Sequence, residues 1–300
     1  MIYTMTLNPA LDYVMHPLTL DMGFTNRSSS EELYCGGNGI NISTLLKELD
    51  VPSIAMGIAG GFTGDYLLTE LQDKGIASNF VRLDRGNTRI NIKLNGIVMT
   101  MVNGMGPKIP EKKVDELLER MDVVRAGDTL VLTGSIPNSL PEDIYTQIMG
   151  KLAGRGIQFV VDAPGQLLME SLKAHPFLIK PNNHELGEIV GKALTTDEEI
   201  IAAARTLQQK GARNVLVSMA GDGALLLDEH GETHRIGCPK GKVVNSVGAG
   251  DSMVAGFVAG WRKTQSYAYA LRLGTACGSA TAFSLGLATR EKIEELLKQI

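Results

Sequence analysis

Short apolar runs alternate with amphipathic stretches along most of the chain. The apolar runs, which we interpret as strands, lie at residues 1–7, 53–60, 129–135, 158–163, 177–182, 214–220 and 224–228. Helical patterns, in which apolar residues recur every three or four positions, fall between them, for example at residues 39–49 and 63–74. Strands and helices in succession predict an α/β protein whose mostly parallel sheet is covered on both faces.

Two segments interrupt this alternation. Residues 88–107 hold two runs of alternating polarity around Asn95-Gly96, a dipeptide that favours a type I′ hairpin turn. A polar stretch from Asp12 to Cys35 separates the first strand from the first helix. We expect these segments, about 12–35 and 87–107, to pair as a small antiparallel lid. Without repeats or a Pro/Gly-rich linker, residues 1–300 are expected to form one domain.

Composition and charge narrow the class of protein. The chain has 300 residues, of which 44% are hydrophobic and 21% charged, as in globular α/β proteins. A net charge of −4 gives no basic surplus for nucleic acid. The three cysteines are odd in number and far apart, which fits a reducing compartment. With no targeting segment and no apolar run near the roughly 18 residues of a membrane span, we expect a cytoplasmic protein without nucleic-acid or membrane partners.

The segment "VGAGDS" carries the clearest candidate chemistry. Gly248, Ala249 and Gly250 precede an apolar helical run, so their N–H groups can converge at the positive end of a helix dipole and hold an anion. Asp251 beside them could accept the proton of a hydroxyl that attacks a phosphoryl group, or it could only cap the helix. The P-loop pattern is missing, and Met253 replaces the last glycine of a dinucleotide motif.

A second glycine-rich segment, "CGGNGINIS", precedes the first helix. Gly37 allows close backbone approach to a ligand, and Asn41 offers an amide suited to sugar hydroxyls. The order and separation of the two segments resemble the ribokinase-like, or pfkB, family of carbohydrate kinases over nearly the whole chain. Its phosphosugar branch, the 1-phosphofructokinases and tagatose-6-phosphate kinases, is most similar, through the further motifs "TLNPALD", "NTRINIK", "LTGSIP", "KPNNHELGE" and "VSMAGDGAL".

The resemblance implies a ribokinase-like three-layer α/β/α fold with a β lid, a homodimer formed through that lid, and use of ATP and Mg²⁺, with room for a monovalent cation. It makes Asp251 the general base, beside an anion hole from the amides of Ala249, Gly250 and Asp251. Glu185 would organise Mg²⁺ through water together with Asn182, although the two residues also fit a helix-capping box. The implied nucleotide-binding residues are Lys180, Asn182, Ser218, Gly221, Gly223, Gly248, Gly250 and Ser279.

On the sugar side, the resemblance makes Asp12 and Asn41 ligands of ring hydroxyls. Arg89 is the better candidate for a substrate phosphate, because a planar guanidinium grips two oxygens at once. The full implied set is Asp12, Gly37, Asn38, Asn41, Arg89, Lys93, Ser135 and, as an assisting residue, Arg27.

Two departures from the family pattern bear on the substrate. Asn38 stands where the phosphosugar kinases usually have lysine, so one positive charge is missing from the expected phosphate site. Met99 and Met101 replace acidic positions on the flap. This apolar tip either closes over the substrate and excludes water or, as we expect, packs against a second copy across a dimer. Our first hypothesis is a kinase of D-fructose 1-phosphate, ahead of fructose 6-phosphate and tagatose 6-phosphate. A kinase of an unphosphorylated sugar or nucleoside and a non-catalytic sugar-phosphate-binding regulator are the alternatives.

Overall fold

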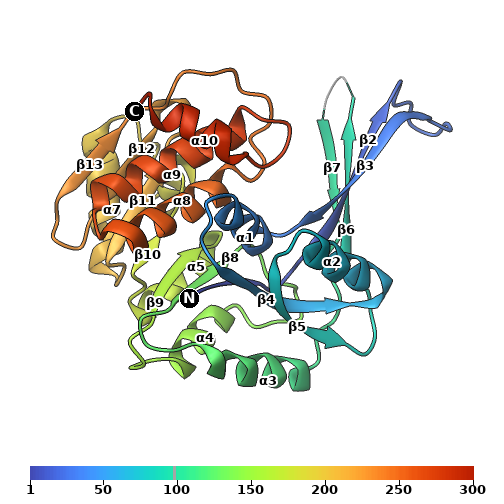
Figure 1. The fold of residues 1–300 in the computed structure, drawn as a ribbon, viewed down its shortest axis with the longest axis horizontal. Helices are drawn as coiled ribbons and strands as arrows, with labels where there is room; N and C mark the ends of the chain where they lie inside the picture. The colour runs from blue at the N-terminus through green and yellow to red at the C-terminus, as the bar shows by residue number, and fades with distance from the viewer. Residues whose placement is uncertain (97–98) are drawn as a thin grey trace.

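The computed structural model describes residues 1–96 and 99–300. Within these residues the main layer is a nine-stranded sheet of order β13-β12-β11-β10-β9-β8-β1-β4-β5 (Figure 1). All neighbours from β5 to β11 pair in parallel, whereas β12 and β13 are antiparallel, which confirms the mostly parallel sheet. The strands are β1 (Ile2–Thr6), β4 (Ser53–Gly60), β5 (Ala77–Leu83), β8 (Thr129–Thr133), β9 (Gln158–Asp162), β10 (Leu178–Ile179), β11 (Asn214–Ser218), β12 (Ala224–Leu227) and β13 (Thr233–Ile236).

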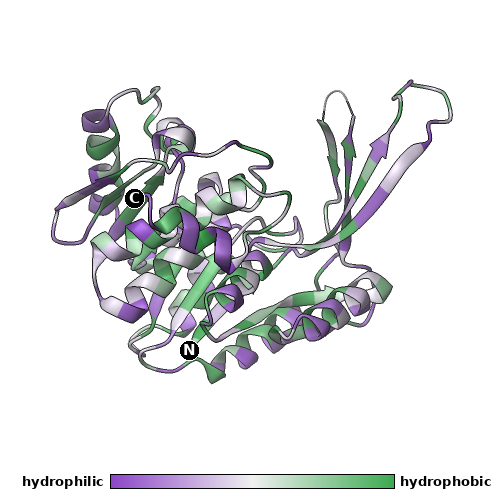
Figure 2. Cartoon of the chain, turned by 45° about the horizontal axis from the view of Figure 1, so that its top comes forward, coloured by the Kyte–Doolittle hydropathy of each residue, from purple (hydrophilic) through white to green (hydrophobic). Residues whose placement is uncertain are grey.

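Helices cover both faces of this sheet, so successive strand residues are buried on opposite sides. In β8, for example, Leu130 and Leu132 join one apolar core and Val131 joins the other. Figure 2 shows the apolar residues gathered along the central strands. None of the described helices has the length and apolar character needed to cross a membrane. One face carries α1 (Asn38–Glu48), α2 (Gly61–Asp73), α8 (Ala249–Thr264), α9 (Tyr267–Ala282) and α10 (Arg290–Leu297), and the other carries α3 (Glu111–Arg120), α4 (Ile144–Lys151), α5 (Gly165–Ser171), α6 (Asn183–Val190) and α7 (Asp197–Gln209).

The lid is a separate four-stranded sheet of order β3-β2-β6-β7, which projects away from the main sheet in Figure 1. Two antiparallel hairpins build it, and the parallel pair β2–β6 joins them. The predicted pairing of the two lid segments is confirmed. The predicted type I′ turn involves residues 97 and 98, which lie outside the described residues. The lid strands are β2 (Ala10–Pro17), β3 (Ser28–Gly36), β6 (Arg89–Asn95) and β7 (Met99–Asn103).

The carboxyl ends of the parallel strands meet at one edge of the main sheet, as they must in this topology. Strands β1, β8 and β9 end there at Thr6, Thr133 and Asp162. Helices α1 and α8 begin at residues 38 and 249, directly after Gly37 and Gly248, which have φ angles of 132° and 79°. Such positive φ angles are readily adopted only by glycine, so both helices can start sharply at this edge.

Candidate functional site

Asp251 lies in the first turn of α8 but does not cap this helix. Gly248 occupies the cap position, and no side chain makes a capping hydrogen bond there. The Asp251 side chain is buried, with 5% of the residue exposed. Asn38 Nδ2 donates to its Oδ1 at 2.9 Å, and Asn41 Nδ2 donates to its Oδ2 at 2.8 Å. The capping alternative is therefore wrong, and the carboxylate is held across the site by two amides from α1.

The charges around Asp251 come from the ends of two neighbouring strands. Lys180 follows β10, is 6% exposed, and places Nζ 3.3 Å from Asp162 Oδ1. Burial raises the pKa of Asp251 to about 7; the Asp162 carboxylate adds to the rise, while the bond from Asn41 and the charge of Lys180 oppose it. A carboxylate with a pKa near 7 is suited to accept a proton at neutral pH.

The first turn of α8 presents free amides next to this carboxylate. The Ala249 amide donates to the carbonyl oxygen of Ser246 at 3.2 Å, so it already has a partner. In the described part of the chain, no backbone carbonyl accepts from the amides of Gly250 and Asp251. A Cβ on Gly250 would lie 3.2 Å from Lys180 Nζ. Two unpaired amides and an ammonium group thus lie together where an anion is expected.

The start of α1 is packed tightly against the ends of β1 and β8. A Cβ on Gly37 would lie 2.7 Å from Thr6 Cγ2, so only glycine fits there. A Cβ on Gly134 would likewise lie 2.7 Å from Asn38 Oδ1. The Asn38 amide therefore has its oxygen against Gly134 and its nitrogen on Asp251. Ser135, the next residue of that loop, is exposed.

Asp12 of the lid is held by two side chains of β6. Lys93 Nζ lies 2.7 Å from Asp12 Oδ2, and Asn91 Nδ2 donates to Oδ1 at 2.8 Å. The parallel register places Asp12 directly opposite Asn91. Asn91 was missed by the sequence reasoning, although it alternates with Arg89 and Lys93 and so faces the same side. Its buried Oδ1 has no partner among the described residues, and a sugar hydroxyl could supply one.

The two predicted phosphate-binding arginines lie in different places. Arg89 is half-buried and donates through Nε to the Asn8 carbonyl at 3.1 Å and through Nη1 to the Gly104 carbonyl at 3.2 Å. Burial lowers the pKa of Arg89, and the nearby Asp12 partly offsets this. Arg27 is exposed in the loop that joins β2 to β3, at the far end of the lid, and a single chain does not bring it to the other sugar-side residues.

The predicted metal-binding pair forms a capping box at the start of α6. Asn182 Oδ1 accepts the amides of His184 and Glu185 at 2.9 and 2.8 Å, and Glu185 Oε2 accepts the Asn182 amide at 2.8 Å. The structure thus shows that the two residues form the helix-capping box that the sequence analysis gave as their alternative role. Glu185 Oε1 has no hydrogen-bond partner in residues 1–96 and 99–300, so it can accept a metal-bound water. Asn182 also forms a β-bridge with Ser218 at the end of β11.

The remaining residues that were predicted to bind the nucleotide differ in their local surroundings. Gly223 has a φ of 88°, and a Cβ there would lie 2.1 Å from the Ile236 carbonyl oxygen, so the backbone itself requires glycine. Gly221 faces open space, where a ligand could approach. Ser279 of α9 lies with its Oγ 3.4 Å from Cys238 Sγ.

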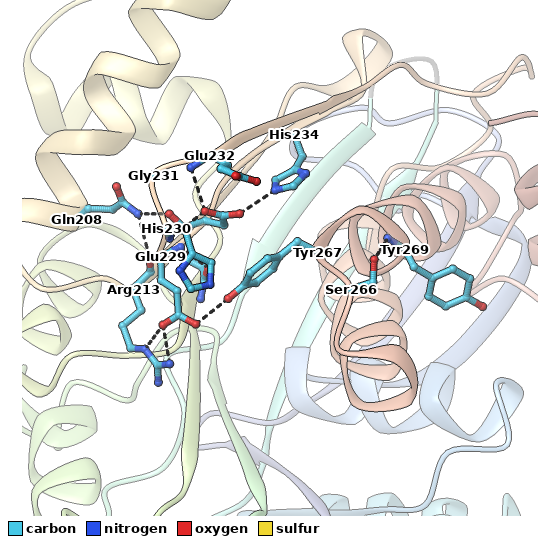
Figure 3. Close-up of polar contacts among 12 residues, drawn as sticks. Gln208, Arg213, Glu229, His230, Gly231, Glu232, His234, Ser266, Tyr267 and Tyr269 are labelled. Carbon is cyan, nitrogen blue, oxygen red and sulfur yellow. Dashed lines mark hydrogen bonds and ion pairs between the residues drawn. The ribbon is translucent and has the colours of Figure 1, made fainter.

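A second polar cluster lies at the turn between β12 and β13, outside the predicted site (Figure 3). Asp228 Oδ1 accepts the amides of His230 and Glu232 at 2.9 and 3.0 Å, and Oδ2 accepts from His234 Nε2 at 2.8 Å. Asp228, Glu232 and His234 are close enough to share a metal ion. Because both oxygens of Asp228 already stabilise the hairpin, closure of the turn accounts for the cluster.

Comparison with known structures identifies the fold. Ribokinase from Arabidopsis thaliana, in complex with ribose and ATP, aligns with a TM-score of 0.82 at 20% identity over 99% of this chain and 98% of that chain. Phosphofructokinase-2 from Escherichia coli, in complex with fructose 6-phosphate, aligns with a TM-score of 0.92 at 28% identity over 99% of this chain and 98% of that one. The chain therefore has the ribokinase-like fold of sugar kinases.

Sequence comparison then gives the family. The chain belongs to the pfkB family of carbohydrate kinases, which it matches over residues 5–293. It is 46% identical to the 1-phosphofructokinase of Bacillus subtilis, over 100% of this chain and 98% of the relative. It is also 37% identical to the D-tagatose-1-phosphate kinase of Bacillus licheniformis, again over 100% and 98% of the two chains. The predicted family and fold are both confirmed, and with them a kinase that uses ATP and a divalent cation.

Proposed function

We propose that this chain phosphorylates D-fructose 1-phosphate to fructose 1,6-bisphosphate, using ATP and Mg²⁺, with Asp251 as the general base. The 46% identity to a 1-phosphofructokinase over the full length supports this substrate.

One observation carries the proposal: a six-residue segment, from Gly36 to Asn41, connects the sugar side to the base. At one end, a Cβ on Gly36 would lie 2.9 Å from Asp12 Oδ2. At the other end, the amides of Asn38 and Asn41 bond both oxygens of Asp251. A sugar whose hydroxyls are held by Asp12 would thus lie beside the segment that also holds the buried carboxylate of Asp251.

The reaction follows from these positions. The primary C6 hydroxyl of the sugar transfers its proton to an oxygen of Asp251 as its own oxygen bonds to the γ-phosphorus, and the bond from that phosphorus to ADP breaks. The free amides of Gly250 and Asp251 and the buried charge of Lys180 stabilise the negative charge on the transferred group. We assign the substrate phosphate to Arg89, which keeps free N–H groups, and to Lys93.

The residues present fit a hydrated magnesium ion. Glu185 offers one free carboxylate oxygen, and Asn182 lies beside it at the start of α6. Magnesium usually retains several waters and accepts few protein ligands, so one carboxylate that acts through water is an adequate site. When bound, the ion supplies charge neutralisation for the ATP phosphates.

D-tagatose 1-phosphate is the second candidate substrate, and the 37% identity to a kinase named for it favours this alternative. It differs from fructose 1-phosphate only in the configuration at C4. Both substrates carry the phosphate on C1 and the free primary hydroxyl on C6, so the same base serves both.

We also propose a homodimer formed through the lid, with the exposed side chains of Met99 and Met101, which share one face of β7, in the interface. Burial of such a patch against a second copy would remove apolar surface from water.

The free thiols Cys35, Cys238 and Cys277 support a cytoplasmic location.

The test is ADP release in a coupled assay with ATP and Mg²⁺, with Asp251→Asn as the blank. The substrates are fructose 1-phosphate, tagatose 1-phosphate, fructose 6-phosphate, tagatose 6-phosphate and free fructose. We expect kcat/KM for fructose 1-phosphate to exceed the others by about tenfold or more, equivalent to about 1.4 kcal/mol in transition-state binding. Preference for free fructose would contradict the proposal.

A further inference from the structure

Asn38 is the one position of the first glycine segment that departs from the usual G-G-K-G pattern of phosphosugar kinases. Within the described residues, its amide makes no hydrogen bond to Arg89 or Lys93 of the lid, whose partners are Asn8, Gly104 and Asp12. The amide nitrogen lies 2.9 Å from Asp251 Oδ1, on a residue 213 positions further along the chain. The amide oxygen lies against Gly134, where even a Cβ would approach to 2.7 Å. The nitrogen of this amide is therefore hydrogen-bonded to Asp251, and its oxygen packs against the loop after β8.

We propose that Asn38 is a positioning residue for the base Asp251 and is not a ligand of the substrate phosphate. Asn38 and Asn41 each donate one N–H to a different carboxylate oxygen, at 2.9 and 2.8 Å. Two such bonds fix the plane of the carboxylate and leave a lone pair on each oxygen for the incoming proton. This inference rests on the proposed function, because it assigns Asp251 the role of base.

The choice of an amide over a lysine has an electrostatic consequence. The charged groups that act on Asp251 are Asp162 and Lys180, from the ends of β9 and β10. Glu185 of α6 acts on Lys180. A lysine at position 38 would add a full positive charge at hydrogen-bond distance, which would favour the ionised carboxylate and weaken it as a base. The asparagine orients the carboxylate without that charge, in keeping with a pKa for Asp251 of about 7.

The kinetic test compares Asn38→Ala and Asn38→Lys with the wild-type enzyme, using fructose 1-phosphate from pH 5.5 to 9.5. The control is Gln209→Ala, which removes an exposed amide at the end of α7 that belongs to none of the assigned sugar, nucleotide or metal residues. For Asn38→Ala we expect kcat to fall about tenfold or more at pH 7, the size of one lost bond to a charged group, with KM for the sugar phosphate within about twofold. The acid limb of the pH profile of kcat should move to higher pH in Asn38→Ala and to lower pH in Asn38→Lys.

The opposite pattern would overturn the proposal. If Asn38→Ala raises KM about tenfold with kcat unchanged, or if Asn38→Lys lowers KM without moving the acid limb, Asn38 belongs to the phosphate site. Failure of the proposed function gives a different result, namely no turnover by the wild-type protein. In that case unfolding by urea still tests the contact. Asn38→Ala should lower the unfolding midpoint at pH 8.5, where Asp251 is ionised, but not at pH 5, and equal changes at both pH values would refute it.

Discussion

Replacement of Asp251 by asparagine should abolish turnover and, at alkaline pH, stabilise the folded protein. The buried carboxylate has a pKa raised from 3.8 to about 7, a difference of about three units. Each unit corresponds to about 1.4 kcal/mol, so ionised Asp251 lowers the free energy of unfolding by about 4 kcal/mol above pH 7. The neutral asparagine avoids that cost.

The pH dependence of this destabilisation follows from proton binding. Between about pH 4 and pH 7 the folded protein holds a proton on Asp251 that the unfolded chain has already released, so the cost grows as pH rises. Below pH 4 both states are protonated and the cost vanishes. In the variant, one N–H of the new amide faces the N–H of Asn38 or Asn41, so one hydrogen bond is lost. This loss lowers the free energy of unfolding of the variant by about 1–3 kcal/mol at every pH.

The assay is urea unfolding of Asp251→Asn and wild type at pH 5 and pH 8, without nucleotide. We expect the difference in unfolding free energy between the two proteins to shift by about 2–3 kcal/mol in favour of the variant between these pH values. Glu188→Gln, which replaces an exposed carboxylate of α6, is the matched control. An unchanged or reversed difference would refute the claim that the carboxylate is destabilised by burial.

Three further predictions concern the pH profile, the sugar side and the lid. For wild-type enzyme, kcat/KM should fall as pH drops below about 7, because the free enzyme must have Asp251 ionised; a flat profile down to pH 5.5 would exclude it as the base. Lys93→Met removes the 2.7 Å ion pair with Asp12 and should raise KM for the sugar phosphate about tenfold or more in initial-rate measurements, whereas an unchanged KM would remove Lys93 from the site. Met101→Glu should convert the dimer to monomer in sedimentation velocity, while the exposed Val123→Glu should not; a monomeric wild type would contradict the lid interface.

The main sheet and its helices could be predicted because their residues are buried by local pattern. Strands such as Thr129–Thr133, buried along their whole length, read as continuous apolar runs between helical patterns. The position of the site at the carboxyl edge also follows from this topology, since glycine-rich helix starts are found there.

The partners of the site residues could not be predicted in the same way. Asn38 bonds Asp251 across 213 residues, and Asn91 meets Asp12 only through the parallel register of β2 and β6. Such contacts depend on how separate elements dock, which local periodicity does not encode. Alternation along β6 would have identified Asn91 as sharing a face with Arg89 and Lys93, but not its partner.

Phosphorus-31 and carbon-13 NMR of the reaction product test directly whether this protein phosphorylates fructose 1-phosphate at C6 and whether Asp251 is required. Purified protein is incubated with fructose 1-phosphate, ATP and Mg²⁺, and Asp251→Asn is treated in parallel. We expect fructose 1,6-bisphosphate with its new phosphate on C6, formed in equal amount to ADP by the wild type and not by the variant. Bisphosphate formed equally by the variant, or ADP formed without any bisphosphate, would contradict this expectation.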